Sequence, residues 1–172
     1  MHRVPGATLA VLATVAAGSL AGCTSAGGPP GSGSAGGRVV IDAKRLPSLG
    51  TVLVDQHGKT LYMFLPDRKH AVTCTGRCLG TWPPVVVGQG GSPKAGSGGV
   101  RQGLLGTVPD GQGRSVASYA GWPLYTYAGD TAPGQTSGQA LDDNGGPWYV
   151  MRVDGHPVIP SGSPSPGASS TS

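Results

Sequence analysis

Short apolar segments separated by polar turns make up most of the hydrophobic pattern of this chain. Residues 51–54 are apolar or β-branched, residues 55–58 are polar and end in Gly, and residues 61–64 are apolar again. A second set follows, with a Pro-Asp-Gly turn at 109–111 and an apolar or aromatic run at 124–127. Short apolar runs bounded by turn signals are typical of β-strands. The pattern therefore predicts an all-β fold built from short antiparallel strands.

Several short sequence segments, called words below, occur twice along the chain and in the same order. The recurring words, given as first and second copy, are Leu-Gly-Thr-Val at 49–52 and 105–108, a Leu-Tyr segment at 58–67 and 121–130, and a Trp followed by a Val-containing run at 82–87 and 148–153. The order holds and only the loop lengths differ, which is typical of a duplicated supersecondary unit. A lone hairpin is only marginally stable in water, so two units packed face to face would supply one core. We predict two pseudo-repeats, about 49–87 and 105–153, joined by a Gly-rich loop at 88–103.

Composition separates the folded part of the chain from its ends. Every Trp, Tyr and Phe lies between Tyr62 and Tyr149. Residues 24–37 and 161–172 are instead rich in Gly, Ser and Pro, which is typical of flexible tethers and disordered tails. We predict one compact two-repeat β domain over 38–160, flanked by a tether and by a disordered tail.

The first 22 residues have the features of a secretory signal. A basic residue, Arg3, precedes an apolar run at 7–20, which is shorter than the about 20 residues that a membrane span needs. The sequence Leu-Ala-Gly-Cys at 20–23 resembles the lipobox of bacterial lipoproteins. The resemblance implies cleavage before Cys23, acylation of its sulfur and of its new amino group, and a lipid anchor on the extracytoplasmic face of the cell membrane. The tether would then run over 23–37, and the membrane is the first expected partner.

Composition and charge narrow the function classes. The chain holds 32 Gly and 16 Pro, and both residue types oppose helix interiors. It contains no Glu, which excludes His-Glu-x-x-His metalloprotease chemistry and Glu-based acid–base pairs. The net charge of +4 is mild and spread along the chain, so no nucleic-acid partner is expected. Because the chain also has no nucleophile elbow, P-loop or dinucleotide fingerprint, we expect neither an enzyme nor a cofactor.

Two cysteines remain once Cys23 is assigned to the anchor. Cys74 and Cys78 would be exported to an oxidising compartment, where such a pair forms a disulfide. Their C-x₃-C spacing differs from the C-x₂-C spacing of redox and zinc motifs. The alternative is that His70, Cys74 and Cys78 present three ligands on one helical face, suited to copper or zinc, or that the thiols cycle between redox states. We predict a structural disulfide and keep the metal or redox site as the alternative.

A second signature supports a family-level interpretation. The pattern Tyr-x-aromatic-x-x-Asp occurs twice, as Tyr62, Phe64 and Asp67 and as Tyr125, Tyr127 and Asp130. The chain also has the lipobox and a segment from Cys74 to Trp82-Pro-Pro, and Trp148 is the second copy of Trp82. Together these features resemble the bacterial secreted-repeat lipoproteins named for the Tyr-x-aromatic-x-x-Asp motif, over about residues 48–153. The resemblance implies an exported, anchored repeat protein of undefined biochemical activity.

The motif residues allow a structural and a ligand-binding interpretation. The four motif aromatics are the bulkiest core material in so Gly-rich a chain, and the alternative is an exposed platform for a glycan or a wall polymer. Asp67 and Asp130 lie in turns, where an Asp accepts backbone N–H groups, and the alternative is ligand or cation binding. Residues 142–146 resemble a calcium loop without its terminal Glu, and a turn explains them equally well. The leading prediction is a non-enzymatic binding or structural module with an unidentified cell-wall or envelope partner.

Overall fold

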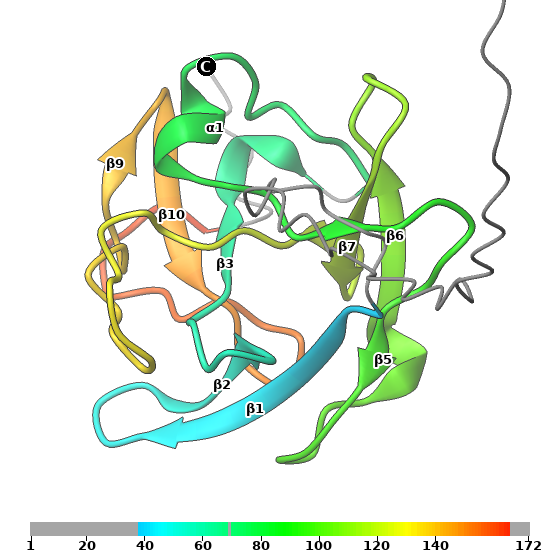
Figure 1. Cartoon of the computed structure of the whole chain (residues 1–172). Helices are drawn as coiled ribbons and strands as arrows, with labels where there is room; N and C mark the ends of the chain where they lie inside the picture. The colour runs from blue at the N-terminus through cyan, green and yellow to red at the C-terminus, as the bar shows by residue number, and fades with distance from the viewer. Residues whose placement is uncertain (1–37, 69, 166–172) are drawn as a thin grey trace, which may run out of the picture. The chain divides into compact units, whose positions relative to one another are not determined.

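The computed structural model describes residues 38–68 and 70–165, and strands dominate them (Figure 1). The predicted signal sequence, Cys23 and the tether lie outside the described residues, as do residues 166–172 of the predicted tail. One short α-helix, α1 (Cys78–Thr81), occurs in the described part. None of the helices described here is long and apolar enough to cross a membrane. The prediction of an all-β fold is confirmed.

Ten strands and two 3₁₀ helices accompany α1 in the described residues. The strands are β1 (Val40–Leu46), β2 (Gly50–Asp55), β3 (Tyr62–Phe64), β4 (Val86–Val87), β5 (Lys94–Ala95), β6 (Leu105–Pro109), β7 (Ser115–Tyr119), β8 (Trp122–Pro123), β9 (Asp142–Asp143) and β10 (Gly146–Val150). The 3₁₀ helices are η1 (Leu65–Asp67) and η2 (Gln102–Leu104). The named strands pair antiparallel, except that β1 and β5 are parallel.

The first hairpin pairs β1 with β2, from Ile41 opposite Asp55 to Leu46 opposite Gly50. Residues 52–54 of β2 are all buried. Side chains alternate between the two faces of a strand, and each face of β2 is covered by a different apolar cluster. An unbroken apolar run is therefore the pattern that this strand requires.

The second hairpin pairs β6 with β7. Asp110 organises its turn, because its carboxylate accepts the backbone N–H groups of Gln112 and Arg114 and pairs with Nε of Arg114 at 2.6 Å. Burial opposes ionisation of Asp110, but these donors hold its pKa below the ordinary value. β4 lies on the other edge of β7, which gives the strand order β4-β7-β6, and β8 pairs back onto β7.

The two hairpins are equivalent, but not through the residues that the sequence suggested. Val52 of β2 lies opposite Lys44, and Val116 of β7 lies opposite Val108. Leu53 accepts the backbone N–H of Leu61 and donates to Met151, as Ala117 accepts that of Leu124 and donates to Val85. Val52 therefore corresponds to Val116, and the expected match of the two Leu-Gly-Thr-Val segments is wrong. The first word begins the second strand of its hairpin, whereas the second word lies in the first strand. A short β-branched word suits either strand, so the pairing decides the equivalence.

Each repeat completes the sheet of the other. β4, which follows Trp82 in the chain, pairs with β7 of the second repeat through Val86 opposite Val116. β10 pairs with β3 of the first repeat, with Trp148 opposite Phe64. β3 and β10 lie side by side in Figure 1, although they are distant in the sequence. The two repeats are therefore interlocked.

The segment 88–103, predicted as a loop, contributes a strand. β5 lies parallel to β1, with Lys94 opposite Val40. Asp42 secures this segment, since its carboxylate accepts the backbone N–H of Ser97 at 2.6 Å and the hydroxyl of Ser97 at 2.8 Å. The Gly-rich composition carries no strand signal, and the free edge of β1 supplies the pairing.

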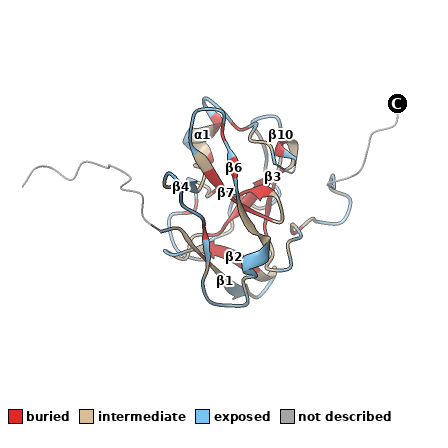
Figure 2. Cartoon of the chain, turned by 90° about the vertical axis from the view of Figure 1, so that its right-hand side faces the viewer, coloured by how far each residue is buried: buried red, intermediate tan, exposed pale blue. Residues whose placement is uncertain are grey.

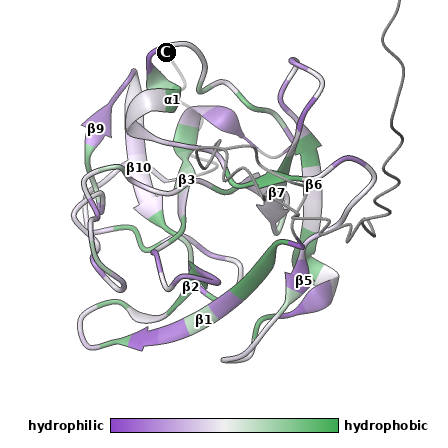
Figure 3. Cartoon of the chain, viewed as in Figure 1, coloured by the Kyte–Doolittle hydropathy of each residue, from purple (hydrophilic) through white to green (hydrophobic). Residues whose placement is uncertain are grey.

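Two apolar clusters fill the interior, and buried residues line β2, β3 and β7 (Figure 2). One cluster contains Val52, Tyr62, Phe64, Cys74, Cys78, Trp82, Tyr125, Trp148, Val150 and Val158. The other contains Ile41, Leu53, Leu61, Met63, Tyr119, Trp122, Leu124, Tyr149 and Met151. β1 begins with the apolar residues Val40 and Ile41, of which Ile41 is buried, and carries the basic residues Lys44 and Arg45 toward its other end (Figure 3). Both clusters draw on both repeats, so the repeats share their core.

The start of the predicted tail is attached to this core. Residues 161–165 are described, and the hydroxyl of Tyr149 donates to the carbonyl oxygen of Pro164 at 3.1 Å. This contact is made by the first, described residues of the predicted tail. A buried Tyr needs a partner for its hydroxyl, and the chain beyond the last strand provides it.

Candidate functional site

The two motif segments meet at Tyr62 and Tyr125. The backbone N–H of Tyr62 donates to the carbonyl oxygen of Tyr125 at 2.9 Å, and the N–H of Tyr125 donates to the carbonyl oxygen of Tyr62 at 3.0 Å. A pair that exchanges both of its backbone hydrogen bonds is arranged about a local twofold axis. The two Tyr residues predicted as equivalent therefore lie at the centre of the repeat symmetry.

The hydroxyl groups of these Tyr residues cross to the other repeat. Tyr62 Oη donates to Oδ2 of Asp130 at 2.6 Å, and Tyr125 Oη donates to Oδ2 of Asp67 at 2.5 Å. All four side chains are buried. The motif residues Tyr and Asp thus bind each other between repeats rather than within one repeat.

Each Asp is also held by the loop that follows it. Asp67 Oδ1 accepts the backbone N–H groups of Thr73 at 2.6 Å and Cys74 at 3.3 Å, and the hydroxyl of Thr73 at 2.8 Å. Asp130 Oδ1 accepts the backbone N–H of Ser137 at 2.8 Å. Both carboxylates therefore play the turn role that the sequence predicted, and the tertiary structure adds the contact with a Tyr.

Burial changes the protonation equilibria of this network. Burial raises the pKa of Asp67 above its ordinary value, although hydrogen bonds from Tyr125 and Thr73 oppose the shift. Burial also raises the pKa of Tyr62 and of Tyr125, and the carboxylate beside each phenol adds to the shift. Both phenols therefore remain protonated near neutral pH and act as donors.

Four aromatic rings form a stack in which the repeats alternate. Trp82 and Trp148 lie parallel at its centre, with ring centroids 3.9 Å apart. Phe64 stacks on Trp148 with ring centroids 4.2 Å apart, and Tyr127 packs on the other face of the pair, tilted by 36° against Trp82 at 4.5 Å. The outer contacts are equivalent under the repeat symmetry. Stacked aromatic pairs contribute about 0.5–1.5 kcal/mol each beyond the area they bury, so the stack holds the repeats together.

Asp143 binds both of the stacked indoles. Trp82 Nε1 donates to Oδ2 of Asp143, and Trp148 Nε1 donates to its carbonyl oxygen, each at 3.0 Å. Asn144 Nδ2 donates to the same carboxylate at 2.8 Å. The segment 142–146, which the sequence left open between a calcium loop and a turn, forms β9, a turn and the start of β10. The sequence carried no signal that joins Asp143 to Trp82.

Cys74 and Cys78 form the predicted disulfide, with Cα atoms 5.4 Å apart, and both residues are buried. A closed loop of this length contributes about 2 kcal/mol in the loop-entropy account. The bridge closes the loop whose backbone binds Asp67. α1 then leads to Trp82, whose N–H donates to the carbonyl oxygen of Cys78 at 2.8 Å. The disulfide therefore supports both a cross-repeat hydrogen bond and the stack.

The alternative ligand set of His70, Cys74 and Cys78 is wrong for this structure. The two sulfurs are bonded to each other, and the side chain of His70 is exposed. The backbone N–H of His70 donates to the carbonyl oxygen of Gly121 at 2.9 Å, which turns this segment toward the second repeat. Across residues 38–68 and 70–165, no three His, Cys, Asp or Glu side chains are grouped so that they could hold a metal ion.

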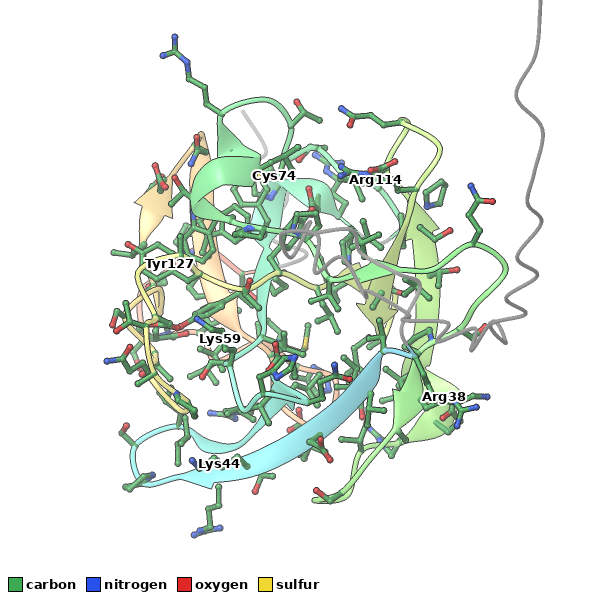
Figure 4. The ribbon with its side chains drawn as sticks, in the orientation of Figure 1. Arg38, Lys44, Lys59, Cys74, Arg114 and Tyr127 are labelled. Carbon is green, nitrogen blue, oxygen red and sulfur yellow. A yellow bond between two sulfur atoms is a disulfide. The ribbon has the colours of Figure 1, made fainter. Side chains whose placement is uncertain are left out.

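The motif aromatics do not form an exposed platform. Tyr62, Phe64 and Tyr125 are buried, and Tyr127 is half-buried at the end of the stack. Tyr127 and Lys59 lie on the same side of the molecule (Figure 4). Lys59 Nζ donates to the carbonyl oxygen of Asp130 at 2.5 Å. The core interpretation therefore holds for three of the four rings, and Tyr127 alone reaches the surface.

Surface hollows lie away from the motif. Each of three hollows measures about 430–480 Å³, and their linings include none of the six Tyr, Phe and Asp residues of the motif. The lining of the first hollow includes Trp122, Asp154 and His156, and that of the second includes Arg38, Gln89 and Lys94. The lining of the third includes His70, Thr107 and Ser118. The residues that line each hollow come from segments far apart in the sequence, so no local sequence pattern predicts these surfaces.

Fold and site together define a class of protein. It is an all-β module of two repeats, each of which gives a strand, a stacked Trp and a Tyr donor to the other. The motif residues build the contact between repeats.

The chain belongs to a family described as a secreted repeat of unknown function, whose sequence profile matches residues 45–86 and 106–152. The two matches coincide with the two interlocked repeats. Neither the curated proteins nor the solved structures contain a match to this chain.

Proposed function

We propose that this protein is exported, anchored through a lipid on Cys23 at the extracytoplasmic face of the cell membrane, and acts there as a non-enzymatic binding or structural module of the envelope. The signal sequence and the lipobox at 20–23 support the anchor. Membership of a secreted family supports export. The disulfide supports an oxidising compartment, because such bonds persist outside the cytosol.

The use of the motif residues is the observation that carries the module assignment. A catalytic site usually presents polar groups in a cleft that a substrate can enter. Here the Tyr and Asp side chains of the motif are buried and bind each other across the repeats. The motif therefore serves the architecture, and recognition would fall to the exposed loops that the architecture presents.

The tether determines where the module would act. Residues 24–37 are rich in Gly, Ser and Pro, and a flexible chain of this length has a mean reach of roughly 20 Å. An anchored module would therefore sample the layer next to the membrane. A partner in the cell wall or on a neighbouring envelope protein lies within that layer.

The anchor is tested by expressing the full chain in a bacterial host with an alkyne analogue of palmitate. We expect the unmodified chain to take up the label and to sediment with membranes, and Cys23→Ser to do neither. The double variant Cys74→Ser/Cys78→Ser is the matched control, since it loses thiols but keeps the lipobox. A Cys23→Ser chain that is processed and still sediments with membranes contradicts the anchor.

The module assignment is tested with the Cys23→Ser protein and purified bacterial cell walls. We expect saturable co-sedimentation without release of soluble wall fragments. Release of such fragments at a rate that follows protein concentration would mean that the protein is an enzyme.

A further inference from the structure

The contact between the two repeats is self-complementary. The hydrogen bond from Tyr62 to Asp130 is matched by the bond from Tyr125 to Asp67. In a twofold interface, residue i contacts residue j while residue j of the partner contacts residue i. Each repeat therefore carries a complete set of groups: one Tyr donor, one Asp acceptor and two rings for the stack.

The strand contacts follow the same rule. Val85 N–H donates to the carbonyl oxygen of Leu124 at 2.9 Å, and Met151 N–H donates to that of Leu61 at 3.0 Å. Val85 and Met151 also act as acceptors in matching bonds. The backbone N–H of Ala117 donates to the carbonyl oxygen of Val85, and that of Leu53 donates to the carbonyl oxygen of Met151, both at 2.8 Å. The last strand of each repeat, β4 in the first and β10 in the second, is thus bound by the other repeat. Neither repeat has a complete sheet by itself.

A single covalent connection joins the two repeats in the described residues. It is the segment 88–103, because the disulfide lies within the first repeat. The segment is attached to the first repeat through β5 and through the bond from Ser97 to Asp42. Nothing in the contact itself requires both repeats to belong to the same chain.

We propose that this interface also accepts a second copy of the chain, by exchange of repeats. The first repeat of one copy pairs with the second repeat of its partner, and the reverse pair closes the dimer. Such swapping is a low-cost route to a dimer, because it reuses contacts that the monomer already makes. The proposal goes beyond the envelope function and does not depend on the lipid anchor.

The connector sets the balance between the closed monomer and the exchanged dimer. A flexible connector holds its two ends at an effective concentration on the order of millimolar. At micromolar chain concentration the repeats therefore pair within one chain. A connector too short to span its end points removes this advantage.

The span can be estimated from the sheet order β4-β7-β6. Val87 lies opposite Ser115 and Leu105 lies opposite Tyr119, on the two outer strands of this sheet. Crossing two strand spacings and four residues along β7 gives a distance of roughly 16 Å. Deletion of residues 89–103 leaves three peptide steps, which reach only about 11 Å. The shortened chain cannot close on itself without breaking a strand pair.

We therefore test a chain that lacks residues 89–103, in the Cys23→Ser background, by size-exclusion chromatography with light scattering. We expect the mass of two chains at micromolar concentration, with the far-ultraviolet circular dichroism of the parent. The matched control replaces the same residues by Gly and Ser in equal number. It loses the same contacts of β5 but keeps the length, and we expect the mass of one chain.

A folded monomer of the shortened chain overturns the proposal, and so does a dimer of the length-matched control at equal abundance. A second measurement remains if the shortened chain does not fold. A protease site replaces residues 89–92 in the otherwise intact chain, and the folded protein is then cut. We expect the two pieces to elute together and to recover this behaviour after unfolding and refolding. Pieces that separate at micromolar concentration would show that the interface cannot hold two molecules.

Discussion

At the scale of single residues, Tyr62 and Tyr125 occupy equivalent positions in unequal networks. Tyr62 Oη donates to Asp130 and accepts the backbone N–H of Gly138 at 3.3 Å. Tyr125 Oη donates to Asp67, whose other oxygen already accepts three further donors. Loss of the Tyr62 hydroxyl removes the partner of a buried acceptor and of a buried donor, whereas loss of the Tyr125 hydroxyl affects one acceptor only.

We predict that Tyr62→Phe lowers the free energy of unfolding by about 2–3 kcal/mol and Tyr125→Phe by about 1–2 kcal/mol, because a buried polar group without its partner costs about 1–3 kcal/mol. Urea unfolding of the disulfide-bonded protein measures both values. Tyr149→Phe is the matched control, since its hydroxyl binds Pro164 at the start of the tail, and we expect a loss below about 1 kcal/mol. Equal losses in the free energy of unfolding at all three positions would mean that the hydrogen bonds between repeats stabilise the protein no more than the bond from Tyr149 does.

The same two phenols give the protein a dependence on alkaline pH. The folded-state pKa of Tyr62 and of Tyr125 lies above the ordinary value of 10.0. Above pH 10 the unfolded chain loses these protons while the folded chain keeps them, so the free energy of unfolding falls as the pH rises. The stabilising contribution is complete below that pH.

We predict that Tyr62 and Tyr125 form tyrosinate only when the protein unfolds. Tyrosinate absorbance and circular dichroism, followed together from about pH 8 to about pH 12, test this expectation. This range includes pH values above the ordinary Tyr pKa, where burial keeps the two phenols protonated in the folded chain. The double variant Tyr62→Phe/Tyr125→Phe should show a shallower loss of stability above pH 10, because it lacks both shifted groups. Complete titration of every Tyr in a folded chain would contradict the burial argument.

At the scale of elements, the sequence predicted strands where apolar runs are bounded by turns. Residues 51–54 lie in β2, and residues 62–64 of the second predicted run form β3. The run at 124–127 was predicted as a strand in the same way, but only Tyr125 there forms isolated bridges, with Tyr62 and Pro84. β5 was missed, because Lys94 and Ala95 lie in a Gly-rich segment without a strand pattern. The free edge of β1 imposes the extended backbone there, and this edge is not visible from the local sequence.

Close approach to β1 explains Gly98 in that segment, whereas Gly99 has only a left-handed backbone. Gly98 has φ +77°, and a Cβ at this position would collide with the carbonyl oxygen of Ala43. Gly99 has φ +90°, and a Cβ there would meet no atom within 4 Å. The two positions share a left-handed backbone but differ in their surroundings.

We predict that Gly99→Ala costs about 1–2 kcal/mol through backbone strain alone and that Gly98→Ala costs more, since it adds the collision. Gly98→Ala should also detach the segment from β1. Amide hydrogen exchange of Ala43, whose N–H donates to the carbonyl oxygen of Ser97 at 3.0 Å, reports this detachment. Gly99→Ala is the control, and equal exchange rates at Ala43 in the two variants would rule out the collision argument.

At the scale of the whole molecule, the repeats cannot be separated into independent domains. Two of the three sheets in the described residues, and both apolar clusters, contain residues of both repeats. The stack of Phe64, Trp148, Trp82 and Tyr127 alternates between them. Loss of one repeat therefore removes the strand and the rings that the other requires.

We predict a single cooperative unfolding transition for the described unit. Thermal unfolding followed by circular dichroism and by Trp fluorescence should give coincident curves, as in two-state unfolding. Single variants Trp82→Phe and Trp148→Phe should each lower the unfolding midpoint of the whole protein, because the two indoles come from different repeats and stack directly on each other. Two separate midpoints, one for each repeat, would contradict the interlocked architecture.

The sequence by itself determined the strand character of the fold, the duplication of the Tyr-x-aromatic-x-x-Asp motif and the pairing of Cys74 with Cys78. These properties depend on residues that are close in the chain, such as apolar runs between turns or two cysteines four residues apart. The same local signals also misled, because Leu-Gly-Thr-Val suits either strand of a hairpin.

Only the tertiary structure decided that each repeat completes the other, that the Tyr and Asp of the motif bind across repeats, and that Asp143 joins the two indoles. These contacts connect residues far apart in the chain, for instance Tyr62 with Asp130. A Tyr-to-Asp hydrogen bond within one repeat and one between repeats leave the same sequence pattern. The choice between them depends on which strands pair and on where burial leaves a polar group without water, and both conditions arise only when the chain is folded.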